Sequence, residues 1–216
     1  MKKYLLFFYL FYISVDFFAQ QLYVEFGPTV SAFDYKNSQG ESLDNLLSKP
    51  HMYMGMGYRS VLNNNQTLFV SIGASYNGYG AIGSDNKLDN YFEWDINYLG
   101  VNAGFDIKLF SLRDFSFYLK GSVAVEFLLR GTQTVNNQVY NLVGEEEFNN
   151  TIFFTRGHLG MQYPISRNTS LFVNYTYGRT ILIGKGNGID QEQLKLITHQ
   201  FGLGLMINLP NCNCPF

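Results

Sequence analysis

The most constraining feature of this sequence is a long stretch, from Leu99 to Arg130, that alternates apolar and polar residues in two arms. A period of two is the spacing of a β-strand with one apolar and one polar face. The tetrapeptide Ser111-Leu112-Arg113-Asp114 joins the arms as a turn. Each arm exceeds the about 5–6 residues of a typical globular strand and suits the roughly 9–11 tilted residues that cross a bilayer. The stretch therefore predicts a hairpin of membrane-crossing strands.

Composition agrees with strands that are apolar on one side only. The 216 residues are 17% aromatic and 15% charged, against a usual charged share of about 25%. The mean hydropathy of −0.06 excludes a protein made of several membrane helices and fits a barrel, whose strands are half apolar. The net charge is −2 and there is no basic run, which argues against a nucleic-acid partner.

Both ends of the chain differ from its middle. Residues 1–19 have the order of a secretory signal peptide, with Lys2 and Lys3 before an apolar run, and we expect cleavage after Ala19. The alternative is an uncleaved anchor, although the run is shorter than the about 20 residues of a membrane span. Residues 210–216 form a tail with Cys212 and Cys214, too close for an unstrained disulfide. We expect a flexible tail, with a metal-binding or intermolecular role as the alternative.

Eight segments of the chain show the alternating pattern. They lie at about 21–33, 51–61, 66–78, 92–109, 115–130, 151–163, 170–183 and 194–209. The connections between them alternate long and short, as in outer-membrane barrels with long outer loops and short periplasmic turns. A sheet inside a bilayer must close on itself. The predicted fold is therefore all-β, an eight-stranded antiparallel up-and-down transmembrane barrel over residues 20–209, with both termini periplasmic.

Some local features need separate interpretations. Phe92, Trp94, Ile96 and Tyr98 are apolar at even numbers although the set from Leu99 onward is odd, which predicts a bulge near Tyr98 or an extension above the bilayer. The aromatic residues there also suit an interfacial girdle. Segments 79–90 and 131–150 are expected to be polar loops, and Glu145-Glu146-Glu147 a solvated part of the second. A row at Met52, Met54 and Met56 is expected to face lipid rather than to bind a soft metal.

The polar face of the strands carries eight charges: Glu25, Arg59, Asp106, Lys108, Lys120, Glu126, Arg130 and Arg156. The interior of an eight-stranded barrel is just wide enough for side chains to fill, and unpaired buried charges are costly. We therefore expect an ion-pair network in the lumen. Counting from the turns places Asp106 opposite or diagonal to Lys120, and Glu126 near Arg156. The network is either a structural plug or the gate of a narrow pore.

Enzymatic activity is not expected, because no convergent set of catalytic residues is visible. His199 faces lipid by its position in the alternation, His51 lies near a strand end, and His158 lies in the lumen beside Arg156. No serine has a clear His/Asp partner, and no His/Glu spacing indicates a metal site. No cofactor is expected.

The pattern and the loop order resemble the small eight-stranded outer-membrane barrels, the OmpX-like and OmpA-barrel-like proteins of the porin family. The last strand matches part of their insertion signal, at Gly202, Gly204, Leu205, Ile207 and Leu209. The resemblance implies a Gram-negative outer membrane, contact with its lipid and lipopolysaccharide, and the barrel-insertion machinery as a partner. We expect a non-enzymatic structural protein or an accessory subunit of a larger outer-membrane complex. The alternatives are a narrow pore, a surface adhesin or an enzyme that modifies lipid A.

Overall fold

The computed structural model describes residues 20–36, 46–85, 90–144, 151–181 and 193–209. These residues form eight long strands: β1 (Gln20–Lys36), β3 (Pro50–Val61), β4 (Leu68–Asp85), β5 (Asn90–Leu112), β6 (Phe115–Val135), β8 (Ile152–Pro164), β9 (Thr169–Ile181) and β10 (Gln193–Asn208). They also form two short ones, β2 (Leu47–Ser48) and β7 (Gln138–Asn141). No helix in these ranges is long and apolar enough to span a membrane. The predicted signal peptide, the tail with its cysteines and Glu145–Glu147 lie outside the described residues.

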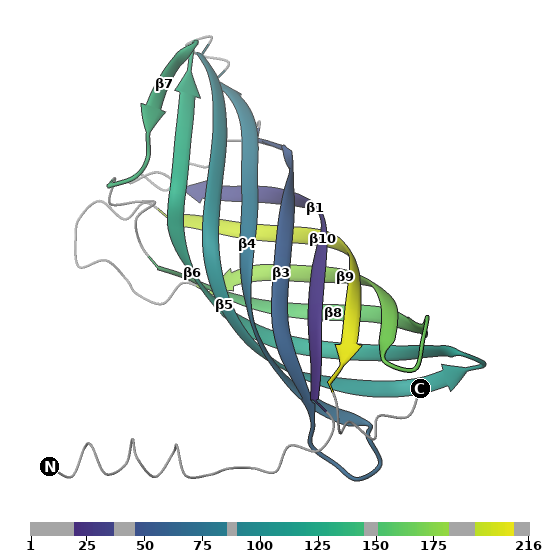
Figure 1. Cartoon of the computed structure of the whole chain (residues 1–216). Coiled ribbons are helices and arrows are strands. Elements are labelled where there is room, and N and C mark those ends of the chain that lie inside the picture. The colour runs from purple at the N-terminus through teal and green to yellow at the C-terminus, as the bar shows by residue number, and fades with distance from the viewer. Residues whose placement is uncertain (1–19, 37–45, 86–89, 145–150, 182–192, 210–216) are drawn as a thin grey trace, which may run out of the picture.

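The long strands form a closed ring (Figure 1). Each pairs antiparallel with the next in sequence, and β1 pairs with β10 to complete the circle. A closed ring satisfies the backbone hydrogen bonds of every wall strand and leaves no edge inside a bilayer. The predicted eight-stranded up-and-down barrel is confirmed.

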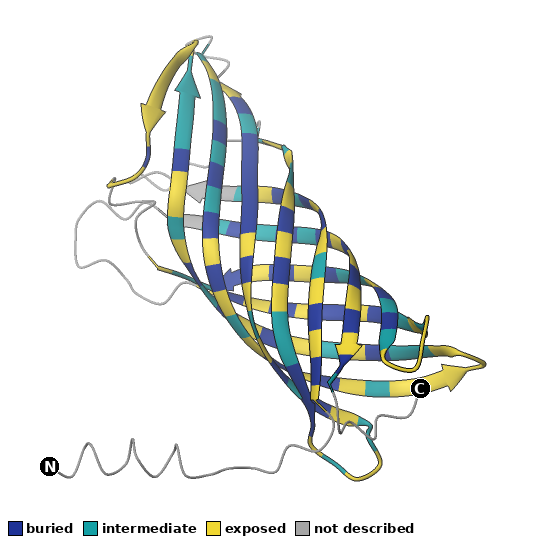
Figure 2. Cartoon of the chain, in the orientation of Figure 1, coloured by how far each residue is buried: buried dark blue, intermediate teal, exposed yellow. Residues whose placement is uncertain are grey.

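The outer surface of the barrel carries an apolar belt. Exposed and buried residues alternate along the wall strands (Figure 2). Outward side chains include Val24, Phe26, Met52, Met54, Met56, Ile72, Val101, Phe105, Leu119, Val123, Leu159, Phe201 and Leu203, all exposed. The methionine row thus lies on the belt. A continuous apolar surface of this size on a closed barrel is a surface for lipid.

The two ends of the barrel differ. The connections at 62–67, 113–114 and 165–168 are short and lie at one end, together with Gln20 and Leu209; we call this the turn end. The other connections leave from the opposite end, which we call the loop end. There β4, β5 and β6 continue beyond the rest of the wall (Figure 1).

This continuation is a small sheet of its own, and it corrects the two loops expected at 79–90 and 131–150. We call it the extension: residues 78–85, 90–97 and 128–135 of β4, β5 and β6, with β7 paired to β6. Asn136 and Asn137 both have positive φ angles, 48° and 69°, the geometry of a tight turn that asparagine tolerates. This turn folds β7 back on β6, so that much of the expected loop is a hairpin.

The expected irregularity near Tyr98 is present, but on the neighbouring strand. Asn97 pairs with Arg130 and Tyr98 with Leu128, so Leu129 is the extra residue of a bulge in β6. Along β5 the even-numbered residues from Trp94 to Asp106 face inward. Trp94 and Tyr98 are buried, at 8% and 1% exposure. The expectation that they form an interfacial girdle was therefore wrong, because the inner face itself becomes apolar at this level.

Candidate functional site

The lumen contains two buried ion pairs at different heights. The first joins Arg156 of β8 to Glu126 of β6, with Nη2 2.5 Å from Oε1. Tyr79 donates to Glu126 Oε2 at 2.8 Å and accepts from Arg156 Nη2 at 2.9 Å. Asn77 donates to Glu126 Oε1 at 2.8 Å and accepts from Gln200 of β10. The carboxylate, which has no exposed surface, thus has its charge and its hydrogen bonds matched from several strands.

The second pair joins Arg59 of β3 to Asp106 of β5, with Nε 2.7 Å from Oδ2. These strands are separated by β4, where Ser71 lies opposite Arg59. The small serine side chain leaves room for the arginine to cross. The guanidinium carbon lies 3.7 Å from the ring centre of Phe69, and Nη1 donates to Gln21 at 3.3 Å. Stacking and hydrogen bonds together fix the orientation of the guanidinium.

Between the two pairs lies a small polar cavity of about 30 Å³, lined in part by Glu25, Asp106 and Lys120. Lys120 lies directly opposite Asp106 in the β5–β6 register, and its Nζ is 5.2 Å from the ring centre of Tyr23. Glu25 accepts a 2.7 Å hydrogen bond from Asn174. A cavity of this size has room for about one water molecule. The centre of the lumen is therefore filled by protein.

Glycines on the inner face make room for these large side chains. A Cβ atom at Gly57 or at Gly73 would lie 2.5 Å from the hydroxyl of Tyr23, and one at Gly160 would lie 2.1 Å from the ring of Tyr118. Strands that alternate glycine with bulky inward residues can thus fill a narrow barrel without strain.

Sequence reasoning missed one buried hydrogen-bond chain. His158 forms two hydrogen bonds with hydroxyl groups. Its Nε2 lies 2.9 Å from Oγ of Ser122, and its Nδ1 lies 2.7 Å from Oγ1 of Thr176. A serine beside a histidine is part of a hydrolytic triad, but here the second ring nitrogen meets a hydroxyl instead of a carboxylate. In the β6–β8 register Lys120 lies opposite His158 and Ser122 lies opposite Arg156. Ser122 and His158 are therefore diagonal neighbours, and this register is the signal that could have brought them together.

One of the eight predicted lumen charges lies elsewhere than expected. Arg130 is exposed, because the bulge at Leu129 shifts the residues after it to the other face; its place in the lumen was wrong. Lys108 lies at the turn end, in a cavity separate from the central one.

In the last strand, Gly202 and Gly204 face inward, Leu205 and Ile207 face outward, and Leu209 follows the strand. Their role in insertion stays a prediction.

An apolar cluster covers the lumen at the loop end. The extension contributes Tyr79, Ala81, Trp94 and Ile96, and β5 adds Tyr98 just below it. Phe154 and Leu196 come from the opposite wall and Leu142 from the segment after β7. Tyr79, Ile96 and Phe154 have no exposed surface. The cluster lies directly above the Glu126–Arg156 pair, because its member Tyr79 is hydrogen-bonded to both residues of the pair. Its side chains fill the inside of the barrel above the polar part of the lumen.

Ion pairs connect the extension to the start of β3 and to Lys49, the residue just before this strand. Lys49 Nζ lies 2.6 Å from Glu93 Oε1 and 2.8 Å from Asp95 Oδ2, and His51 Nε2 lies 2.9 Å from Asp95 Oδ1. Burial opposes the charge on Lys49, but the hydrogen bonds to Asp95 and Glu93 outweigh it and raise the pKa of this lysine. Among the described residues, no group of histidine, cysteine and acidic side chains could hold a metal ion.

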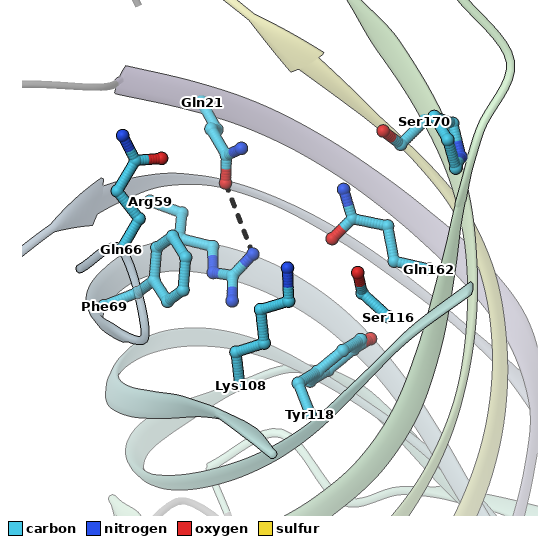
Figure 3. Close-up of a pocket in the computed structure, with 10 residues that line it drawn as sticks. Gln21, Arg59, Gln66, Phe69, Lys108, Ser116, Tyr118, Gln162 and Ser170 are labelled. Atoms are coloured by element: carbon cyan, nitrogen blue, oxygen red, sulfur yellow. Dashed lines mark hydrogen bonds between the residues drawn. The ribbon is translucent and has the colours of Figure 1, made fainter. Parts of the chain in front are cut away.

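The turn end of the lumen holds a second cavity, of about 40 Å³ (Figure 3). Side chains from several strands point into it, among them Gln21, Arg59, Lys108, Ser116 and Gln162. The cavity is lined by amides, hydroxyls and two cations, and none of the described residues that line it carries a carboxylate.

Comparison of the whole fold with solved structures finds small membrane barrels. Neisserial surface protein A (NspA) superposes with a TM-score of 0.50 at 13% identity, covering 87% of this chain and 97% of that one. This chain has the fold of a small outer-membrane β-barrel. No protein-family model and no curated protein matches the sequence, so the likeness is one of fold.

Other barrels match with lower scores. The outer membrane protein OprG from Pseudomonas aeruginosa gives a TM-score of 0.49 at 14% identity, covering 88% of this chain and 97% of that one. Ail, the attachment invasion locus protein of Yersinia pestis, solved with the heparin analogue sucrose octasulfate, gives 0.40 at 16% identity, covering 87% and 99%.

Proposed function

We propose that this protein is a non-enzymatic, non-conducting barrel of the Gram-negative outer membrane that acts as a binding module, through its extension. The observation that carries the proposal is the combination of a filled, capped lumen with a sheet that continues beyond the apolar belt. The outward residues of the extension, such as Glu93, Asp95 and Thr132, are polar. This part of the wall is therefore built for water and not for lipid.

The filled lumen argues against transport and catalysis as the main task. The central cavity, of about 30 Å³, has room for about one water molecule, and the turn-end cavity, of about 40 Å³, has room for nothing larger than a small ion. A substrate would have to displace the buried pair at Glu126 or the apolar cluster above it. The Ser122–His158 pair lies beside the central cavity, with no room for an ester or an acyl chain.

The orientation we propose places the turn end in the periplasm and the extension outside the cell. Short turns on the periplasmic side and longer segments on the outer side are the usual arrangement of outer-membrane barrels. Both ends of the described chain, Gln20 and Leu209, then lie in the periplasm.

The contact surface that we propose is the hairpin formed by β6 and β7. All four residues of β7 are exposed, and Val139 and Tyr140 expose 67% and 50% of their surface. One edge of β7 pairs with β6. Apolar side chains on a short outer strand offer both backbone and side-chain contacts to an extended segment of another protein. This supports the role of accessory subunit or adhesin.

Replacing Val139 with Lys is expected to abolish co-isolation of the partner, because it places a charge in the centre of the contact. The measurement is affinity isolation of the tagged protein from gently solubilised outer membranes, with quantitative mass spectrometry. The matched control is Ile165→Lys, which changes another exposed apolar residue, in a turn at the opposite end. Loss of the partner from Ile165→Lys but not from Val139→Lys would overturn the proposed surface.

A further inference from the structure

The turn-end cavity has the chemistry of an anion site. Its lining combines two cationic side chains, Arg59 and Lys108, with the polar side chains of Gln21, Ser116 and Gln162 (Figure 3). Within the part of the chain that the structure describes, no acidic side chain lines it. Asp106 balances the charge of Arg59 from the lumen side, so Lys108 leaves the site with one net positive charge. That charge favours a negative guest.

Arg59 is positioned in advance for such a guest. It is buried, with 6% of its side-chain surface exposed. Asp106 binds Nε from the lumen side, Gln21 accepts from Nη1, and Phe69 stacks on the guanidinium plane. These contacts hold the group still, and Figure 3 shows it bordering the cavity. A guanidinium held in this way loses little freedom when it binds an oxyanion.

Lys108 supplies the second charge. Its backbone N–H donates to Thr67 at 2.8 Å, which fixes the end of β5 against the turn before β4. Figure 3 shows its side chain extending into the cavity beside Arg59. Among the described residues it makes no salt bridge. Asp106, two residues earlier on the same face, is already bound to Arg59.

The opposite wall offers hydroxyl and amide groups. Ser116 and Gln162 lie opposite each other on β6 and β8, and Ser170 lies opposite Pro164 on β9. We propose that this cavity binds one small oxyanion, a phosphate or a carboxylate group, between Lys108 and Arg59 on one side and these polar side chains on the other. The site is independent of the proposed contact at β7, which lies at the other end of the barrel.

The experiment titrates the purified full barrel in lipid nanodiscs with inorganic phosphate and, separately, with sodium acetate, using calorimetry at constant ionic strength. The expected result is saturable binding of one anion per barrel. Lys108→Gln is expected to weaken it about tenfold, the worth of one charge-assisted hydrogen bond. The control Arg167→Gln removes an exposed cation in a turn at the same end and is expected to leave affinity within about twofold, as for a screened surface charge.

The two anions distinguish the sources of the ligand. Preference for phosphate indicates a phosphorylated small molecule, and preference for acetate indicates a carboxylate group. Binding of either anion that is weakened in Lys108→Gln but not in Arg167→Gln supports the site. No saturable binding of either anion overturns the proposal, and so does an equal loss in both variants, because a general surface potential would then explain it. Unchanged heat-modifiable migration of Lys108→Gln shows that the variant is folded.

Discussion

Replacing Arg156 with Met is expected to lower the free energy of unfolding of the barrel by about 3–5 kcal/mol, the usual cost of removing one partner of a buried ion pair. Glu126 has no exposed surface and takes its only salt bridge within the described residues from Arg156. Methionine fills similar space but leaves the carboxylate charge uncompensated. The measurement is urea unfolding in lipid vesicles, followed by tryptophan fluorescence of Trp94, which lies in the cluster above the pair.

Two further variants make this result specific. Arg156→Met combined with Glu126→Gln removes the unpaired charge and is expected to recover a large part of the loss. Arg179→Met changes an exposed arginine on the next strand and is expected to shift stability by less than about 0.5 kcal/mol. A loss below about 1 kcal/mol for Arg156→Met alone would show that the pair is not a structural element of the lumen.

Replacing Gly27 with Ala is expected to prevent correct closure of the barrel. A Cβ atom at this position would lie 1.8 Å from the backbone carbonyl oxygen of Phe201 on β10. A backbone atom cannot rotate away, so the strands β1 and β10 would have to separate. Gly27 and Pro28 also interrupt the otherwise regular β1–β10 register, since proline has no N–H to donate. We expect loss of the compact, heat-modifiable form from the membrane fraction.

The matched control is Gly157→Ala. An added Cβ at Gly157 would meet nothing within 4 Å. Gly157 also lies within a strand, so the change from glycine to alanine alters the intrinsic strand propensity by the same amount at both positions. This variant is expected to assemble like the wild type. Normal assembly of Gly27→Ala would contradict the close approach of the two strands that complete the ring.

Alternation in the sequence was enough to predict the wall of the barrel, because the period of a strand is tied to its two faces. The position of each turn then determined which residues face each other. Counting from Arg113 and Asp114 predicted Asp106 beside Lys120, and the structure has them opposite each other. The same counting predicted Glu126 near Arg156, and the two form a salt bridge.

The change of phase near Tyr98 predicted a bulge or an extension above the bilayer, but the inner face of the extension could not be predicted in the same way. Its inward residues Trp94 and Ile96 are apolar, so the rule that apolar side chains face lipid gave the wrong face for them. The bulge at Leu129 shifts the phase of β6, and no residue type marks its position; Arg130 was misplaced for this reason. The Arg59–Asp106 pair joins strands that are not neighbours, and only the closed ring in three dimensions brings them together.

The conductance of the purified barrel in planar lipid bilayers distinguishes a closed lumen from an open one. We expect no current steps above those of a protein-free bilayer, because the apolar cluster around Ile96 and Phe154 and the pair at Glu126 and Arg156 close the lumen. A known wide porin, measured in the same bilayer, shows that insertion of a conducting barrel is detected. Reproducible steps from the wild-type protein would contradict the account, and would make it a pore instead of a closed binding module.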